Sequence, residues 1–266
     1  DHGAPWPDDK RIALIEEKYA EGEVVATSQA LSADWQNRRY ETTQLWAYRP
    51  LNVPDVPAGK NPIDWFIDKK LAEAGLEAAP DAEARHLIRR MSFNVTGLPP
   101  TPDRVKSFAT AYAKHPGDAV KALADELMAT PQYGEQFARH WLDVVRYADS
   151  AGFANDYTRP NAWRYRDYVV RAFNNDKPYN QFIREQIAGD EIGPSDSEML
   201  IATGFLRMGP WEQTGMSVFK ETRQLWLDDV TDSVGQTFLA HAMQCAKCHD
   251  HKFDPVPTRD YYRMMA

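Results

Sequence analysis

The sequence predicts a mainly α protein: an irregular multi-helix domain with an extended, proline-rich N-terminal arm. Three observations favour this class. Apolar residues recur at helical spacing from residue 61 onward, proline follows a capping residue at several segment starts, and no run alternates long enough for a convincing strand. We expect the arm to cover residues 1–60 and the helical domain residues 61–266.

The arm combines one expected helix with an extended segment. Residues 9–20 favour a helix because their apolar side chains recur at helical spacing. These side chains are Ile12, Leu14, Ile15 and Tyr19. Pro50, Pro54 and Pro57 each fix φ and remove a backbone donor. Residues 50–57 are therefore expected to be extended.

The domain is expected to be a succession of helices. Asn61 is a good N-cap and Pro62 suits the first helical position, so a helix begins there and runs to Gly75, whose glycine ends it. Thr101-Pro102 and Thr130-Pro131 repeat the start signal. The further expected segments are 81–94, 101–113, 117–129, 131–147, 161–174, 179–188, 197–206, 220–243 and 259–266.

Length, charge and the first residue restrict the class of protein. A chain of 266 residues can bury a sizeable core. Its formal charge of −8 argues against nucleic acid as the main partner. No apolar run is long enough to span a bilayer. The chain begins with Asp1 and not with Met, so we expect a processed product whose signal peptide has been removed.

The strongest chemical signal is the pattern Cys-x-x-Cys-His at Cys245, Cys248 and His249, which contains both cysteines of the chain. This pattern is typical of c-type haem attachment. One helical turn presents two thiols to the two vinyl groups, and the next residue places an imidazole under the iron as proximal ligand. The sequence therefore predicts one covalent haem c.

Other interpretations of the same segment stay open. Cys245, Cys248, His249, His251 and Asp254 offer mixed sulfur, nitrogen and oxygen ligands that would suit zinc or iron. The two thiols could also form an inert or redox-active dithiol. In either case the module could serve assembly and not catalysis.

The sixth iron ligand has several candidates in the sequence. They are Met264, Met265, His140, His241, Met208 and Met216. Met264 and Met265 also fit the apolar face of the last expected helix, and His241 fits an apolar stripe as a core histidine. His251 is too close to His249 to reach the opposite haem face easily, so a propionate or a neighbouring side chain suits it better. An open iron site would favour catalysis over electron transfer.

A second polar region follows in the stretch 139–167. Arg139, Asp143 and Arg146 share a helix face, with His140 and Tyr147 close by. One interpretation is a structural network of ion pairs. The other is a polar pocket, with arginine for haem propionates or an anionic substrate and with His140, Asp143 or Asp149 for proton transfer. The candidate catalytic residues are His140, Asp143 and Arg146.

Several stretches of the domain resemble one known family. They are residues 61–64, 87–90, 96–102, 133–135, 140–143, 159–167 and 245–255. The family is the planctomycete-type cytochrome-associated domain of unknown function, and the resemblance covers roughly residues 45–266. It implies an exported protein linked to redox chemistry and to polysaccharide breakdown. Family members often carry a cytochrome c domain in front and another domain behind, so we expect this chain to be a fragment or a processing product.

Three functions follow from these patterns, in this order. The first is an exported, periplasmic c-type haem protein that transfers electrons. The second is a haem-dependent oxidoreductase, and the third a metal-binding or structural assembly module. The expected partners are a redox protein and the rest of the parent polypeptide or another subunit.

Overall fold

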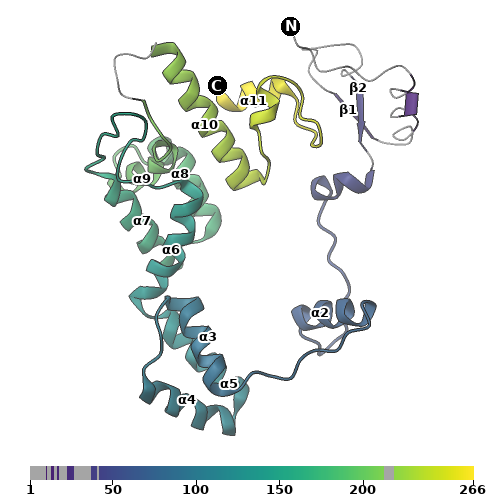
Figure 1. Cartoon of the computed structure of the whole chain (residues 1–266), viewed down its shortest axis with the longest axis vertical. Helices are drawn as coiled ribbons and strands as arrows, with labels where there is room; N and C mark the ends of the chain where they lie inside the picture. The colour runs from purple at the N-terminus through teal and green to yellow at the C-terminus, as the bar shows by residue number, and fades with distance from the viewer. Residues whose placement is uncertain are drawn as a thin grey trace. The chain divides into compact units, whose positions relative to one another are not determined.

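The computed structural model describes residues 42–212 and 219–266, the segments 23–26 and 37–40, and residues 10, 13, 14 and 17 (Figure 1). Two compact units are present. The first combines Asp1–Ala79 with Val234–Ala266, and the second is Pro80–Ser233. The described parts are mainly helical, as the sequence predicts. The boundary expected at residue 60 stays a prediction.

The first unit opens with a pair of short strands. Strands β1 (Glu23–Ala26) and β2 (Asn37–Tyr40) are antiparallel. The sequence did not predict them, because four residues are too few for alternation to stand out. The helix expected over 9–20 lies mostly outside the described residues, although its described positions 10, 13, 14 and 17 are helical. The 3-10 helix η2 (Thr42–Tyr48) follows, and residues 50–57 form neither helix nor strand.

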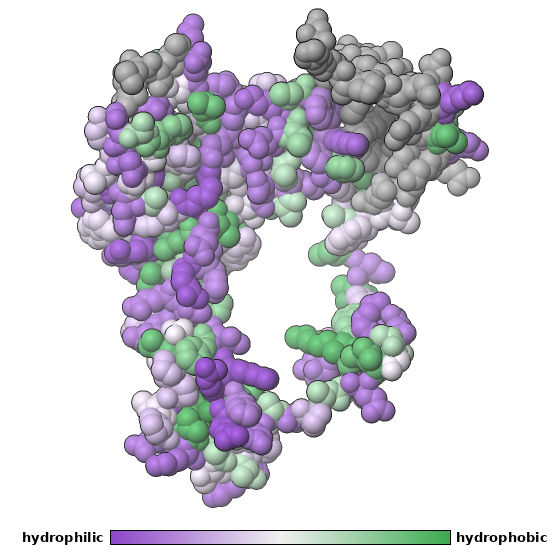
Figure 2. Space-filling model, viewed as in Figure 1, coloured by the Kyte–Doolittle hydropathy of each residue, from purple (hydrophilic) through white to green (hydrophobic). Residues whose placement is uncertain are grey.

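Helix α2 (Pro62–Glu73) begins as predicted. The Asn61 side chain accepts hydrogen bonds from the backbone N–H groups of Ile63 and Asp64 at 2.9 and 3.5 Å. At the other end Gly75 adopts a left-handed φ of 65°, which glycine adopts at little cost. Figure 2 shows apolar side chains on this helix, and Ile63 and Ile67 are more than half exposed.

The second unit begins with three helices around one apolar cluster. They are α3 (Ala84–Thr96), α4 (Pro102–Lys114) and α5 (Pro116–Met128). The buried members of the cluster are Ile88, Phe108, Ala119 and Leu123. Ile88 is fully buried, which contributes about 1.5–3 kcal/mol. Leu87 and Met91 pack against the cluster, and Arg85, Arg89 and Arg90 are exposed.

The remaining helices of this unit are α6 (Pro131–Val145), α7 (Ala162–Asn174), α8 (Tyr179–Ile192) and α9 (Ser197–Ala202), with the 3-10 helix η3 (Thr203–Arg207). Helices α6 and α7 pack along each other, and α8 packs against both α9 and η3 (Figure 1). The end predicted for α8 at Ala188 coincides with a break in its helical geometry there.

A buried polar network joins α6, α7 and α8. The Trp141 indole N–H and the Tyr165 hydroxyl both donate to the Gln186 side-chain oxygen, at 2.9 and 2.5 Å. Beside them the Tyr168 hydroxyl donates to Glu185 at 2.7 Å, and Lys177 forms an ion pair with the same carboxylate. Buried polar groups require such partners. The network therefore fixes the mutual orientation of the three helices.

The last two helices are α10 (Phe219–Leu239) and α11 (Thr258–Met265). Helix α10 ends four residues before the position the sequence predicts, at Leu239 and not Met243, because Ala240 adopts a left-handed φ of 56° that cannot continue a helix. Among the described residues, none of the helices combines the length and apolar character needed to cross a membrane.

Candidate functional site

The Cys-x-x-Cys-His motif occupies its own short 3-10 helix, η4 (Gln244–Lys247), and does not continue the preceding α-helix. Cys248 is the C-cap residue of this turn. Both Cys245 and Cys248 are free thiols and both are exposed. The two sulfur atoms are therefore open to reaction without unfolding.

The turn is anchored by the residues between and before the cysteines. Ala246 is fully buried and Met243 nearly so, in a cluster with Val256 and Tyr261 of the following segment. Met264 and Met265 of α11 pack against this cluster. These two methionines thus occupy the apolar face that the sequence offers as the alternative to iron ligation.

His249 follows directly, and its ring is fixed by a backbone contact. The His249 Nδ1 atom lies 2.8 Å from the carbonyl oxygen of Asp250. A carbonyl oxygen only accepts hydrogen bonds, so this contact requires a proton on Nδ1. Metal-binding histidines usually have this arrangement, in which one ring nitrogen donates to a carbonyl and the other faces the metal.

The loop after His249 is closed by side chains. His251 is buried, and its Nδ1 accepts a hydrogen bond from the backbone N–H of Asp254 at 2.9 Å. The backbone N–H of His251 donates to the carbonyl of Val256 at 2.9 Å. His251 therefore supports the loop, a role that its closeness to His249 in sequence already favours over iron ligation.

Asp250 is a site residue that the sequence analysis missed. Its buried carboxylate accepts a hydrogen bond from the backbone N–H of Thr258, the first residue of α11, at 2.7 Å. Pro257 occupies the local N-cap position and cannot cap through its side chain. The sequence carries no signal of this role, because Thr258, directly before the expected helix 259–266, is itself a favoured capping residue.

The candidates for a sixth iron ligand lie in different environments. The His241 Nε2 atom is 2.6 Å from the Tyr48 hydroxyl, and the two rings stack at 5.5 Å. Met208 is buried in the second unit, and His140 is exposed beside Phe137. Met216 lies outside the described residues. The sixth ligand stays a prediction.

The residues of the motif can be compared with what a covalently held haem and a bare metal ion each require. Haem c needs two thiols and one imidazole in this order, and the turn offers all three. A zinc site needs three or four converging protein ligands. Across residues 42–212 and 219–266 and the shorter described segments, no three His, Cys, Asp or Glu side chains converge in that way. A mixed-ligand zinc or iron site around His251 and Asp254 is thus not preassembled.

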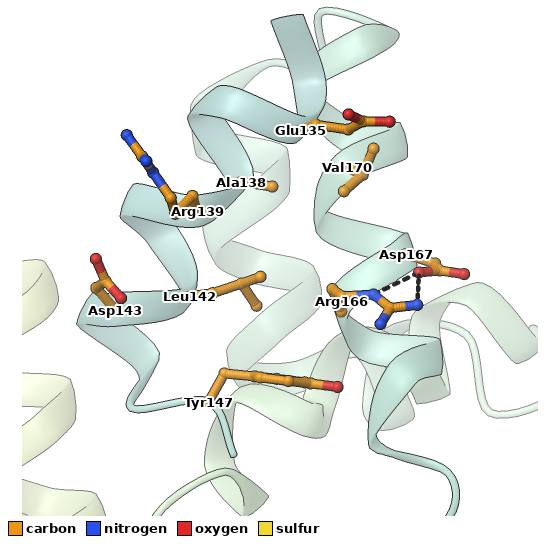
Figure 3. Close-up of a pocket in the computed structure, with 9 residues that line it drawn as sticks. All are labelled: Glu135, Ala138, Arg139, Leu142, Asp143, Tyr147, Arg166, Asp167 and Val170. Carbon is orange, nitrogen blue, oxygen red and sulfur yellow. Dashed lines mark hydrogen bonds and ion pairs between the residues drawn. The ribbon is translucent and has the colours of Figure 1, made fainter. Parts of the chain in front are cut away.

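A second candidate site is a cleft of about 490 Å³ between α6 and α7 (Figure 3). The buried Ala138 together with Leu142 and Val170 forms its apolar surface. The polar residues that line it are Glu135, Arg139, Asp143, Tyr147, Arg166 and Asp167. The structure thus brings five polar residues of the predicted stretch 139–167 to one cleft.

The polar side chains of the cleft differ in direction. Figure 3 shows Arg139 and Asp143 directed away from Leu142, on the outer side of α6, and Arg166 paired with Asp167 on α7. The Tyr147 hydroxyl donates to Asp149 at 2.6 Å. Burial, reinforced by this hydrogen bond, raises the pKa of Tyr147 to about 12. Tyr147 thus stays a neutral donor at neutral pH.

Arg146 does not belong to the cleft. It ends α6 with a left-handed φ of 60° and forms an ion pair with Asp229 of α10. Burial raises the pKa of Asp229, and the charge of Arg146 opposes this effect. Gly209 lies so close that an added Cβ would meet the Asp229 carboxylate. This arrangement matches the structural interpretation of Arg146, whereas Asp143 and Arg139 line the cleft.

Comparison with known proteins adds one relationship. Residues 62–266 match the family model described as PSCyt2, protein of unknown function (DUF1549). No curated protein and no solved structure matches the chain.

Proposed function

This chain belongs to the PSCyt2 family, whose description gives no function, and we propose that it is an exported c-type haem protein that transfers electrons. The observation that carries the proposal is the turn at Cys245 and Cys248 with His249 directly after it. Two exposed thiols, followed by an imidazole whose Nδ1 contacts a backbone carbonyl, are the groups that covalent haem binding requires.

Each residue of the turn has a separate role. The Cys245 and Cys248 thiols would each add across one vinyl group, with sulfur bonded to one vinyl carbon and the hydrogen to the other. His249 would bind iron through Nε2, while its Nδ1–H stays on the Asp250 carbonyl. The haem, when bound, supplies reversible one-electron chemistry at iron. The chain itself holds the group and orients the imidazole.

Charge supports a transfer role with a basic partner. The formal charge of −8 favours encounter with a positively charged protein surface at low salt. Attachment of haem to cysteines also suits an exported location. The partner would be a redox protein or another part of the parent polypeptide.

A haem-dependent oxidoreductase is the second candidate, and the α6–α7 cleft favours it. This cleft has an apolar floor with charged groups around it, as sites for small polar substrates often do. The polysaccharide link implied by the family resemblance belongs to this candidate. The two functions require different coordination of the haem iron. Electron transfer needs no open coordination position, whereas oxidation of a bound substrate does.

The test is expression in cells that carry a c-type haem maturation system. We expect a red protein with a Soret band, in which the haem stays with the chain after denaturation. The Cys245→Ala, Cys248→Ala double variant should lose all covalent haem, because no other thiol is present. His249→Ala removes the proposed iron ligand and should change the spectrum. His86→Ala, at an exposed histidine of α3, is the matched control and should keep the wild-type spectrum.

Carbon monoxide separates the two candidates. A reduced spectrum that carbon monoxide leaves unchanged would support electron transfer, and a shifted Soret band would support the oxidoreductase. Folded wild-type protein without any haem would contradict both.

A further inference from the structure

A second cavity, separate from the α6–α7 cleft, opens beside the buried network of the second unit. Its volume is about 370 Å³. Five of the residues that line it are aromatic: Tyr133, Trp141, Phe173, Tyr179 and Phe182. The two charged residues in the lining are Asp176 and Lys177. Neither the electron-transfer function nor the cleft of Figure 3 uses this cavity.

The aromatic walls are held in place before any ligand binds. The Trp141 ring is fixed by its N–H bonds to Tyr165 and Gln186, at 3.1 and 2.9 Å. It meets Phe182 at 4.9 Å between ring centroids, and Tyr179 at 6.4 Å with an interplanar angle of 86°. Two walls therefore meet at nearly a right angle. Such corners of π-faces attract organic cations.

The charges of the cavity leave one carboxylate in excess. The Lys177 ammonium is already engaged, in an ion pair with Glu185 and over the Tyr168 ring at 4.7 Å. The Asp176 carboxylate, in contrast, has no hydrogen-bond or ion-pair partner among the described residues. The net charge of Asp176, Lys177 and Glu185 is thus negative, which favours a cation over an anion.

Asp176 also has a backbone conformation that costs glycine less free energy than it costs aspartate. It follows the C-cap of α7 with a left-handed φ of 48°. The N–H of Asp176 donates to Phe173 and that of Lys177 to Ala172, the pattern of a helix end that usually has glycine at this point. A carboxylate thus lies beside the cavity at a position where the backbone alone would favour glycine.

We propose that this cavity binds a small organic cation, with the aromatic corner at Trp141 and Tyr179 around its alkylammonium group and Asp176 as counter-ion. The ligand class is a quaternary or alkylated ammonium compound. The aromatic walls cover part of the ligand, and the carboxylate supplies the charge that a neutral ligand would not need.

Calorimetric titration of the full chain with choline is the test, with 3,3-dimethylbutan-1-ol as the uncharged ligand of the same shape. We expect choline to bind at least about tenfold more tightly, a preference of roughly 1.4 kcal/mol. Equal binding of the alcohol would show an apolar pocket only and would overturn the proposal. So would the absence of choline binding, or binding of glucose in its place.

Variants tie the binding to these residues. Asp176→Gly should weaken choline binding about tenfold yet keep or raise Tm, because glycine accepts the left-handed backbone. If the role of Asp176 were purely structural, Asp176→Gly would not weaken choline binding while Tm stayed the same or rose. Tyr179→Ala should also weaken choline binding. Two controls outside the cavity should not: Tyr157→Ala, at a similarly exposed tyrosine, and Asp190→Asn. Unchanged affinity in Asp176→Gly would overturn the proposal.

Discussion

At the scale of single residues, Asp250 supports the candidate haem site through both its backbone and its side chain. Its backbone carbonyl fixes the His249 ring, and its side chain caps α11. One residue thus links the orientation of the imidazole to the start of the next helix. A change of the Asp250 side chain should disturb α11 more than the orientation of the His249 imidazole.

We therefore expect Asp250→Ala to destabilise α11 by about 1 kcal/mol, the usual cost of losing a helix cap. Hydrogen exchange of the α11 amides measures this, since the effect is local. Asp68→Ala, at an exposed position of α2, is the control and should leave the exchange unchanged. Wild-type exchange in Asp250→Ala would show that the cap contributes nothing.

At the scale of elements, close approach of backbones decides how α8 and α9 pack. A Cβ built on Gly189 would lie 2.2 Å from the backbone oxygen of Met199. Backbone atoms cannot move aside as the end of a flexible side chain can, so the two helices would have to separate. Gly117 of α5, in contrast, has nothing within 4 Å of an added Cβ.

Gly189→Ala should accordingly lower the free energy of unfolding by about 3 kcal/mol, the upper range for overpacking. Gly117→Ala is the matched substitution, and it should raise stability by about 0.5–1 kcal/mol through helix propensity. Urea denaturation of both variants gives the comparison. Equal effects from the two substitutions would contradict the close packing of α8 on α9.

At the scale of the whole molecule, buried phenols make stability sensitive to alkaline pH. Burial is the main cause that raises the pKa of Tyr147, to about 12, and it also raises the pKa values of Tyr165 and Tyr168. Each folded phenol keeps its proton at a pH where the unfolded chain has lost it. The stability from this difference is therefore complete below pH 10, the ordinary tyrosine value, and declines above it.

We expect the free energy of unfolding to fall between pH 10 and 12, by up to about 1.4 kcal/mol per pH unit for each such phenol. Urea denaturation at intervals across this range measures the slope. Tyr165→Phe should reduce the slope, and Tyr157→Phe, at a half-exposed tyrosine, should not. A flat profile would mean that the phenols ionise as readily folded as unfolded.

How far the sequence predicts the molecule depends on the range of the interactions involved. Helix starts at Pro62 and Pro102 are predictable, because the cap and the proline are neighbours in the chain. The early end of α10 is not, because Ala240 carries no local stop signal and is left-handed only in the folded chain.

In the candidate sites, too, the sequence predicts local patterns and does not predict contacts between distant residues. Cys245, Cys248 and His249 are visible as a pattern, and the stretch 139–167 does contribute to a cleft. The direction of Asp143 and the pairing of Arg146 with Asp229 depend on tertiary packing, 83 residues apart in the second case. No periodicity within a helix carries that information.

The contrast between Gly189 and Gly117 has a consequence for the history of the family. Both are single glycines inside helices, and neither has an unusual φ. Drift should have replaced the second freely, with alanine the most frequent substitute, while selection should have kept the first in every lineage that retains the α8–α9 pair. A set of related sequences would then separate a glycine that tertiary packing requires from one that it does not.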